Sequence, residues 1–194
     1  MAPGRIRDGV GLTSALGAGA PADGGPGPAQ AVPEGAVEPV RDGAVGTLSV
    51  GGVDFREITD DDVEQVVALW EACGLARPWN DPHLDVADAR TAPSSTVLVA
   101  RAGAPGSGAG PVVATAMAGF DGHRGWIYYV AVAPGLQGTG LGRDAVVAAE
   151  AWLASQGVRK VRLMVRTTNT QVLGFYERLG YLDAECTVLG RDLG

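Results

Sequence analysis

The chain has 194 residues, of which 46% are hydrophobic and 19% are charged. This composition provides enough apolar material for one compact core and excludes collagen-like, coiled-coil and wholly disordered proteins. The formal net charge of −7 argues against nucleic-acid binding as the main activity, because binding to a phosphate backbone depends on dense Lys and Arg. Any anionic ligand is therefore expected to be held locally, by backbone amides.

Residues 1–50 differ in composition from the rest of the chain. They contain 11 Gly and 6 Pro, no aromatic residue, and no sustained helical or alternating pattern. Such a segment cannot offset its ordering entropy by burial, so we expect a disordered tail. The sequence predicts one domain over residues 51–194.

The first half of this domain mixes strands with helices. A strand is expected at 53–58, followed by a helix at 63–74 whose apolar side chains fall on one face. A weakly periodic stretch at 83–90 predicts a short second helix. Two antiparallel strands follow at 95–101 and 112–120, joined by a flexible Gly-rich loop.

The second half contains the most apolar strand. Residues 125–133 are rich in β-branched and aromatic side chains, and a Gly-rich loop then leads into an apolar-periodic helix at 143–157. A strand at 158–166 and a helix at 168–180 follow, and residues 181–193 are expected to form a final strand or hairpin. The order predicts an α/β (α+β) domain, a mixed sheet with helices over its faces.

The loop between the long strand and the next helix is the main candidate for a binding site. Gly135, Gly138, Gly140 and Gly142 would let the backbone approach a ligand, and a helix start offers unpaired N–H groups and a positive dipole. Leu141 follows Gly140 where a Walker A loop requires Lys, and the spacing is not that of a dinucleotide fingerprint. We expect a pyrophosphate site here, with a Gly-rich turn that binds nothing as the alternative.

This loop also resembles a motif of a known family. The segment Gln137-Gly138-Thr139-Gly140-Leu141-Gly142 is similar to the Q/R-x-x-G-x-G/A acetyl-CoA motif of the GNAT N-acetyltransferases. Downstream, Asn169, Phe175-Tyr176 and Gly180-Tyr181 resemble the family's N-x-x-x-x-x-F-Y-x-x-x-G-Y segment. The match covers residues 53–192, and the stretches WNDP, DGHRGWIYY and MVR resemble the bacterial YpeA group of predicted acetyltransferases.

The resemblance implies the GNAT fold, with a mixed and mostly antiparallel central sheet flanked by helices. It also implies an acyltransferase that moves an acetyl group from acetyl-CoA to a primary amine by direct attack in a ternary complex. The acceptor is expected to be a small-molecule amine or a protein N-terminus or lysine. A non-catalytic acetyl-CoA sensor, which would not need Tyr176, is the alternative.

The contacts with acetyl-CoA also follow from the resemblance. In the family, the strand segment that corresponds to 128–132 splays from its neighbour, so that its backbone pairs with pantetheine and an N–H near Val130 polarises the thioester. The amides of residues 138–143 would hold the pyrophosphate, beside the neutral donor Gln137. The implied contacts are Val130, Ala131, Val132, Gln137, Gly138, Thr139, Gly140, Leu141, Gly142, Arg143, Asn169 and Tyr176. Core packing is the alternative for the side chains of 130–132.

Proton transfer has three candidate residues. Tyr176 matches the tyrosine that protonates the CoA thiolate in many relatives, and a phenol with a pKa of about 10 suits a thiol leaving group, with aromatic packing as the alternative. His123 and Asp121 lie in the turn before the long strand, and either could take the amine's proton, with a water relay as the alternative. Asn169 would cap the last helix or bind the cofactor.

The acceptor pocket is expected around Trp79, Asn80, Asp81 and Tyr128, although core packing is the alternative for Trp79. Acidic side chains in this region would attract a cationic amine, unless they form only a solvated surface.

The remaining signals are negative. Cys73 and Cys186 form no CxxC motif, so we expect two buried thiols, no metal site and no cysteine near the motifs to form an acetyl-enzyme. With no signal peptide and no long apolar run, the sequence predicts a cytoplasmic protein, monomeric or homodimeric, with no nucleic-acid or membrane partner.

Overall fold

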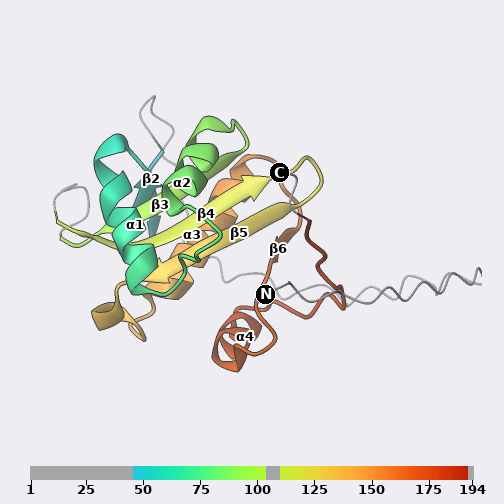
Figure 1. The fold of residues 1–194 in the computed structure, drawn as a ribbon. Coiled ribbons are helices and arrows are strands. Elements are labelled where there is room, and N and C mark those ends of the chain that lie inside the picture. The colour runs from blue at the N-terminus through green and yellow to red at the C-terminus, as the bar shows by residue number, and fades with distance from the viewer. Residues whose placement is uncertain (1–45, 104–109, 192–194) are drawn as a thin grey trace, which may run out of the picture. The chain divides into compact units, whose positions relative to one another are not determined.

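The structure is a computed structural model that describes residues 46–103 and 110–191. The tail is expected over residues 1–50, and its residues 1–45 lie outside the described residues, as do residues 104–109 of the loop between the two antiparallel strands. The described residues contain a six-stranded sheet with the strand order β1-β2-β3-β4-β5-β6 (Figure 1). All neighbouring pairs are antiparallel except the parallel pair β5 and β6. The predicted mixed, mostly antiparallel sheet is therefore confirmed.

The elements follow the predicted order with small shifts at their ends, except that only three of the nine residues expected as a strand at 158–166 form one. The strands are β1 (Leu48–Val50), β2 (Val53–Glu57), β3 (Ser95–Arg101), β4 (Val112–Phe120), β5 (Gly125–Val132) and β6 (Val161–Leu163). The helices are α1 (Val63–Ala72), α2 (Pro82–Thr91), α3 (Leu141–Ser155) and α4 (Thr170–Arg178), and short 3-10 turns lie at Asp60–Asp62 and Pro134–Leu136.

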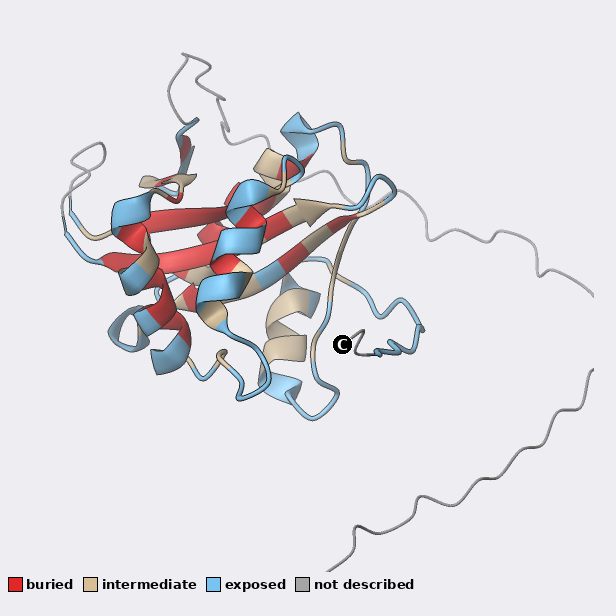
Figure 2. Cartoon of the chain, turned by 45° about the horizontal axis from the view of Figure 1, so that its top comes forward, coloured by how far each residue is buried: buried red, intermediate tan, exposed pale blue. Residues whose placement is uncertain are grey.

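Helices cover both faces of the sheet (Figure 1). Alternate residues of β3 mark the two faces, because side chains along a strand point to opposite sides. Val97 and Val99 are buried in a cluster with α1 and α2, whereas Leu98 and Ala100 are buried in a cluster with α3. Figure 2 shows that the buried residues concentrate in the central strands and in the helix faces turned toward them.

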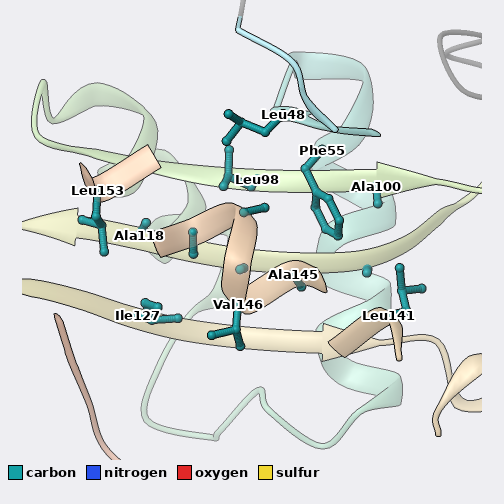
Figure 3. Close-up of a cluster of buried hydrophobic side chains, with 14 of the residues drawn as sticks. Leu48, Phe55, Leu98, Ala100, Ala118, Ile127, Leu141, Ala145, Val146 and Leu153 are labelled. Atoms are coloured by element: carbon teal, nitrogen blue, oxygen red, sulfur yellow. The ribbon is translucent and has the colours of Figure 1, made fainter. Parts of the chain in front are cut away.

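Small side chains bring α3 close to the middle of the sheet. Alanines at 114, 116 and 118 of β4 are fully buried, and they share one cluster with Ala145, Ala148 and Ala149 of α3 (Figure 3). Short side chains on both surfaces let the helix backbone pack closely on the strands. This packing places the first turn of α3 beside the end of β5.

A buried carboxylate anchors the start of α1. Asp62 accepts hydrogen bonds from the Thr59 backbone N–H (2.8 Å), from Arg56 (2.7 and 2.8 Å) and from Arg101 (2.6 Å). Burial alone would raise the pKa of Asp62, but the hydrogen bonds from Arg56, Thr59 and Arg101 hold this pKa well below its ordinary value. Thr59 and Asp62 form a capping box ahead of α1, and the two arginines tie α1 to β2 and β3.

The sheet begins before the expected start of the domain. β1 pairs with β2 through a turn at Gly51 and Gly52, both at positive φ, and Leu48 is buried beside Phe55. The boundary expected at residue 51 therefore lies inside a β-hairpin. The Gly and Pro content of the first 50 residues hides this three-residue strand at their end.

The C-terminal part of the described chain lacks the expected final strand. No strand is present in residues 181–191, and Leu182, Val188 and Leu189 are exposed. Asp183 accepts a hydrogen bond from the backbone N–H of Glu185, which adopts a φ of +52°. The chain turns there instead of extending, so the prediction of a strand or hairpin is wrong for these residues.

Candidate active site

β5 changes its neighbours halfway along its length. Gly125, Trp126 and Ile127 pair with β6, and in the described chain no later residue of β5 does. Pairing with β4 continues to Val132, and Figure 1 shows β6 running away from β5. The segment 128–132 therefore has one paired edge and one edge that β6 leaves open, which is the arrangement expected of a splayed strand.

A β-bulge lies at the start of this segment. Thr115 pairs with Ala131 and Met117 pairs with Tyr128, so that Tyr129 and Val130 together face Ala116. Tyr129 has a φ of +47°, a left-handed conformation that is uncommon for a residue with a side chain. The bulge changes which face of the sheet each following side chain points to. Tyr129 packs against the α1 cluster, and Val130 packs against the α3 cluster. Bulges of this kind re-aim backbone and side-chain groups beside active sites.

Tyr129 is held by three other residues. Its ring stacks on Trp70 with centroids 3.9 Å apart, its carbonyl accepts a hydrogen bond from Thr115 Oγ1 (3.0 Å), and its hydroxyl donates to Asp85. Burial and the Asp85 carboxylate raise the pKa of Tyr129 to about 12, so its hydroxyl stays a neutral donor. The sequence analysis missed Tyr129, Trp70 and Thr115, because no local pattern indicates a bulge or its partners across the sheet.

The Gly-rich loop follows β5 directly and lies open. Gly138 and Gly140 have φ values of +81° and +99°, and a Cβ added at either would meet nothing within 4 Å. Gly140 is also the N-cap of α3 and provides no side-chain cap. In the described chain, the N–H groups of Gly138, Gly140 and residues 141–143 find no acceptor. These free donors at a helix start form a site for an anion.

Gln137 turns back onto the protein. Its side-chain amide donates to the carbonyl of Val132 (3.2 Å), which also accepts a hydrogen bond from Cys73 Sγ (3.2 Å). The side-chain amide of Gln137 is therefore hydrogen-bonded to β5, the strand that precedes it. The predicted role of Gln137 toward a phosphate stays a prediction.

Helix α4 approaches the same place. A Cβ added at Gly142, in the first turn of α3, would lie 3.6 Å from Val132 and 3.7 Å from the Phe175 ring. β5, α3 and α4 therefore meet at Gly142. Asn169 caps α4 by accepting a hydrogen bond from the Val172 N–H (3.2 Å), so its predicted cap role is present in the structure.

Tyr176 lies on α4 between two aromatic rings. Its ring makes edge contacts with Phe175 (centroids 4.9 Å apart) and Tyr181 (5.5 Å). Burial raises the pKa of Tyr176 to about 12, and no described residue accepts a hydrogen bond from its hydroxyl. The phenol is therefore protonated at neutral pH and free to donate, and its packing and acid roles are compatible.

His123 and Asp121 lie in the turn at the other end of β5. Asp121 accepts hydrogen bonds from the backbone N–H groups of His123 (2.7 Å) and Arg124 (2.6 Å) and from Trp126 Nε1 (2.9 Å). These hydrogen bonds lower the pKa of Asp121 to about 2, and the bond from the Arg124 N–H has the largest effect. At ~3.3 Å per residue the strand separates this turn from Val130, so the structure does not bring the two candidates together with the loop. Their role as base stays a prediction.

The candidate acceptor residues lie on exposed parts of the molecule. Trp79 is 72% exposed, so the core alternative for it is wrong. Asn80 donates its N–H to the Arg77 carbonyl (3.0 Å), and Asp81 caps α2 by accepting from the N–H of His83 (2.9 Å). Tyr128 on β5 is 37% exposed and stacks against Trp126.

The two cysteines differ from expectation. Cys186 is exposed, so the prediction of two buried thiols is wrong for it, because the segment that holds it forms no strand. Cys73 is half-buried and contacts Val132, so the expectation that no cysteine lies near the motifs is also wrong. Burial raises the pKa of the Cys73 thiol, which therefore stays protonated.

The described residues contain no cluster of three or more His, Cys, Asp or Glu side chains that could hold a metal ion. None of their helices is both long enough and apolar enough to cross a membrane.

Known proteins resemble this chain in sequence and in fold. The profile of the acetyltransferase (GNAT) family matches residues 57–181. An acetyltransferase of Pectobacterium atrosepticum is 38% identical over 141 residues, which cover 73% of this chain and 96% of that protein. The subgroup resemblance stays a prediction.

Solved structures have the same fold. A Trypanosoma brucei acetyltransferase is 25% identical, with a TM-score of 0.55 over 73% of this chain and 99% of that one. An aminoglycoside N-acetyltransferase in complex with the bisubstrate analogue CoA-S-monomethyl-acetylneamine is 18% identical, with a TM-score of 0.60 over 72% of this chain and 97% of that one.

Proposed function

This chain belongs to the GNAT family of acetyltransferases, and we propose that it is an N-acetyltransferase that moves the acetyl group of acetyl-CoA to a primary amine. The family supports acetyl-CoA-dependent transfer. The acceptor and the direct-attack mechanism are the additional parts of the proposal. We place the reaction in the cytoplasm and in a monomer or homodimer.

The single observation that carries the proposal is the open half of β5 beside the Gly-rich loop. Within the described residues, the segment 128–132 has an edge without a strand partner, and the free N–H groups of 138 and 140–143 follow it within a few residues. A long ligand with an amide-containing arm and a pyrophosphate fits such an arrangement, because the strand edge binds the arm and the helix start binds the phosphates. These are the features by which the residues fit acetyl-CoA.

The residues of the chain have separable tasks in this reaction. Acetyl-CoA supplies the activated acetyl group. The Val130 N–H polarises the thioester carbonyl, and Tyr176, a neutral phenol, gives its proton to the departing sulfur. Direct attack by the amine is favoured over an acetyl-enzyme, because the Cys73 thiol stays protonated and donates to a backbone carbonyl.

The acceptor is proposed to approach from the exposed surface near Trp79, Asn80, Asp81 and Tyr128. A half-buried carboxylate, Asp85, lies on this side with the Tyr129 hydroxyl as its partner, and its charge would attract an ammonium group. Solvent at this surface would take the amine's proton. Because aminoglycoside acetyltransferases share this fold, small polycationic amines are the first set of acceptors to test.

The test is turnover with a panel of amines. Release of free CoA is measured with the full chain, acetyl-CoA, and a panel of small amines, polycationic amines and peptides with free N-termini or lysines. We expect CoA release that depends on one amine class and is lost with the N-acetylated form of the same amine. Binding of acetyl-CoA with no turnover of any amine would contradict the proposal and favour the sensor.

A further inference from the structure

Two buried side chains hold the bulge at Tyr129 from the α1 side. Trp70 Nε1 donates to Thr115 Oγ1 (2.9 Å), and Thr115 Oγ1 donates to the carbonyl of Tyr129 (3.0 Å). Trp70 and Thr115 are both 0% exposed, so water does not compete for these hydrogen bonds. The ring of Trp70 also stacks on the ring of Tyr129. Together they fix the backbone carbonyl and the side chain of one residue.

The direction of this carbonyl determines the direction of the next amide. Tyr129 and Val130 share a peptide plane, and in a trans peptide the C=O and N–H groups point in opposite directions. The carbonyl of Tyr129 points to Thr115 on β4, so the N–H of Val130 points away from it. β5 lies between β4 and β6, and β6 has already left the strand at this position. The N–H of Val130 therefore faces the open edge.

We infer that Trp70 and Thr115 are positioning residues, which act through Tyr129 to hold the Val130 N–H toward the thioester carbonyl. The inference rests on the proposed function, and neither residue touches the reacting atoms. The left-handed φ of Tyr129 costs free energy that its surroundings must offset. The hydrogen bonds and the ring stack provide that compensation at the position where the amide must be aimed.

Removing the Thr115 hydroxyl tests the inference. Thr115→Val keeps the shape of the side chain but frees the Tyr129 carbonyl, so kcat should fall by about tenfold or more, below the ~10²–10³-fold loss for removing such a donor outright. The KM for acetyl-CoA should barely change, because the loop is untouched. Thr115→Ser keeps Oγ and should restore kcat. Thr96→Val is the matched control, because Thr96 is also a buried threonine, on β3.

A binding measurement separates positioning from turnover. Calorimetry compares CoA with the ketone analogue of acetyl-CoA in which a methylene replaces the thioester sulfur. Thr115→Val should weaken binding of the ketone by about threefold or more, for loss of one polarising hydrogen bond, and should leave binding of CoA unchanged. If Thr115→Val does not fold, Trp70→Phe removes the indole N–H together with part of the buried ring system and serves in both measurements.

The outcomes separate a failure of this inference from a failure of the proposed function. Unchanged kcat together with an unchanged ketone affinity would overturn the inference and leave Trp70 and Thr115 as core residues. Equal losses in Thr115→Val and Thr96→Val would overturn it as well, since a general packing defect explains both. A wild-type protein that turns over no amine would contradict the proposed function, and the ketone measurement would still decide whether Thr115 aims the amide.

Discussion

The two halves of β5 belong to one strand but have opposite surroundings. Residues 125–127 pair on both sides, and the carboxylate of Asp121 in the adjoining turn takes up two backbone N–H groups and an indole N–H. Among the described residues, 128–132 pair only with β4, and the N–H groups of 138 and 140–143 in the adjoining loop have no acceptors. Polar groups are satisfied internally at one end and left open at the other.

The comparison teaches which signals locate a site. The turn contains Asp121 and His123, the two titratable side chains that sequence reasoning offers as the base. The other end has few charged groups but offers a row of backbone donors. An open strand edge followed directly by free N–H groups at a helix start is the stronger indication of a ligand, because together they can bind one long anionic molecule.

The largest expected effect comes from the loop. Gly140→Asp places a carboxylate at the anion site, and like charges about 4 Å apart repel by roughly 4 kcal/mol near a protein surface. The affinity for acetyl-CoA, measured by calorimetry, should therefore fall by about 10²-fold or more. The φ of +99° also makes the variant slightly less stable, because a side chain is strained there.

Gly122→Asp is the matched control for this change. Gly122 lies in the turn at the other end of β5, also at positive φ (+88°) and also with open space around it. The same charge and the same backbone strain should leave acetyl-CoA affinity unchanged. Equal losses in the two variants would mean that the two ends of β5 do not differ as described.

The next effect concerns Tyr176. Tyr176→Phe keeps the edge contacts with Phe175 and Tyr181 but removes the proton donor, so kcat should fall by about 10²-fold, within the range for a general acid. Acetyl-CoA affinity should be unchanged. Because the pKa of Tyr176 is about 12, the phenol stays protonated through pH 10, and wild-type kcat should not decline below that pH through this group. Full turnover by the variant would make Tyr176 a packing residue.

A truncation at the start of the chain has a moderate effect on stability. Deleting residues 1–50 removes β1 and the buried Leu48, so the free energy of unfolding should fall by about 2 kcal/mol or more and Tm by roughly 4 °C or more. Deleting only residues 1–45 should leave Tm unchanged, because that segment has the composition of a tail. Differential scanning calorimetry of both truncations separates the hairpin from the tail, and equal Tm values would contradict the role given to β1.

The smallest effect is expected in the turn. His123→Ala should keep kcat within about twofold and should leave the pH dependence of kcat between about pH 5 and pH 8 unchanged. Its ring lies in an exposed turn at the far end of β5. A large loss of kcat together with the loss of that pH dependence would identify His123 as the base and would locate part of the chemistry at this end.

Much of the fold is visible in the sequence, because strong local patterns determine it. The apolar run within 95–101, the apolar strand at 125–132 and the Gly-rich loop all have short-range signals, and all three lie where they were expected. The short strand β1 was missed because three residues give no pattern of their own. The final strand was wrongly expected because the residue pattern of 181–193 does not reveal the turn at Asp183 and Glu185.

The candidate site was predictable in part for the same reason. The loop and Tyr176 belong to contiguous motifs, and the structure brings the loop, β5 and α4 together at Gly142. The bulge at Tyr129 depends on pairing between β4 and β5, and its anchors on α1 and β4 are 14 or more residues away in sequence. Contacts of this kind arise only from tertiary packing, so no motif in the chain indicates them.

Amide hydrogen exchange with and without CoA tests the central claim most directly. A bound ligand slows exchange at the backbone groups that it contacts or orders. We predict slower exchange at 128–132 and at 138–143 when CoA is added to the full chain, and no change at 121–127. Slower exchange confined to 121–127, with none at the loop, would contradict the account.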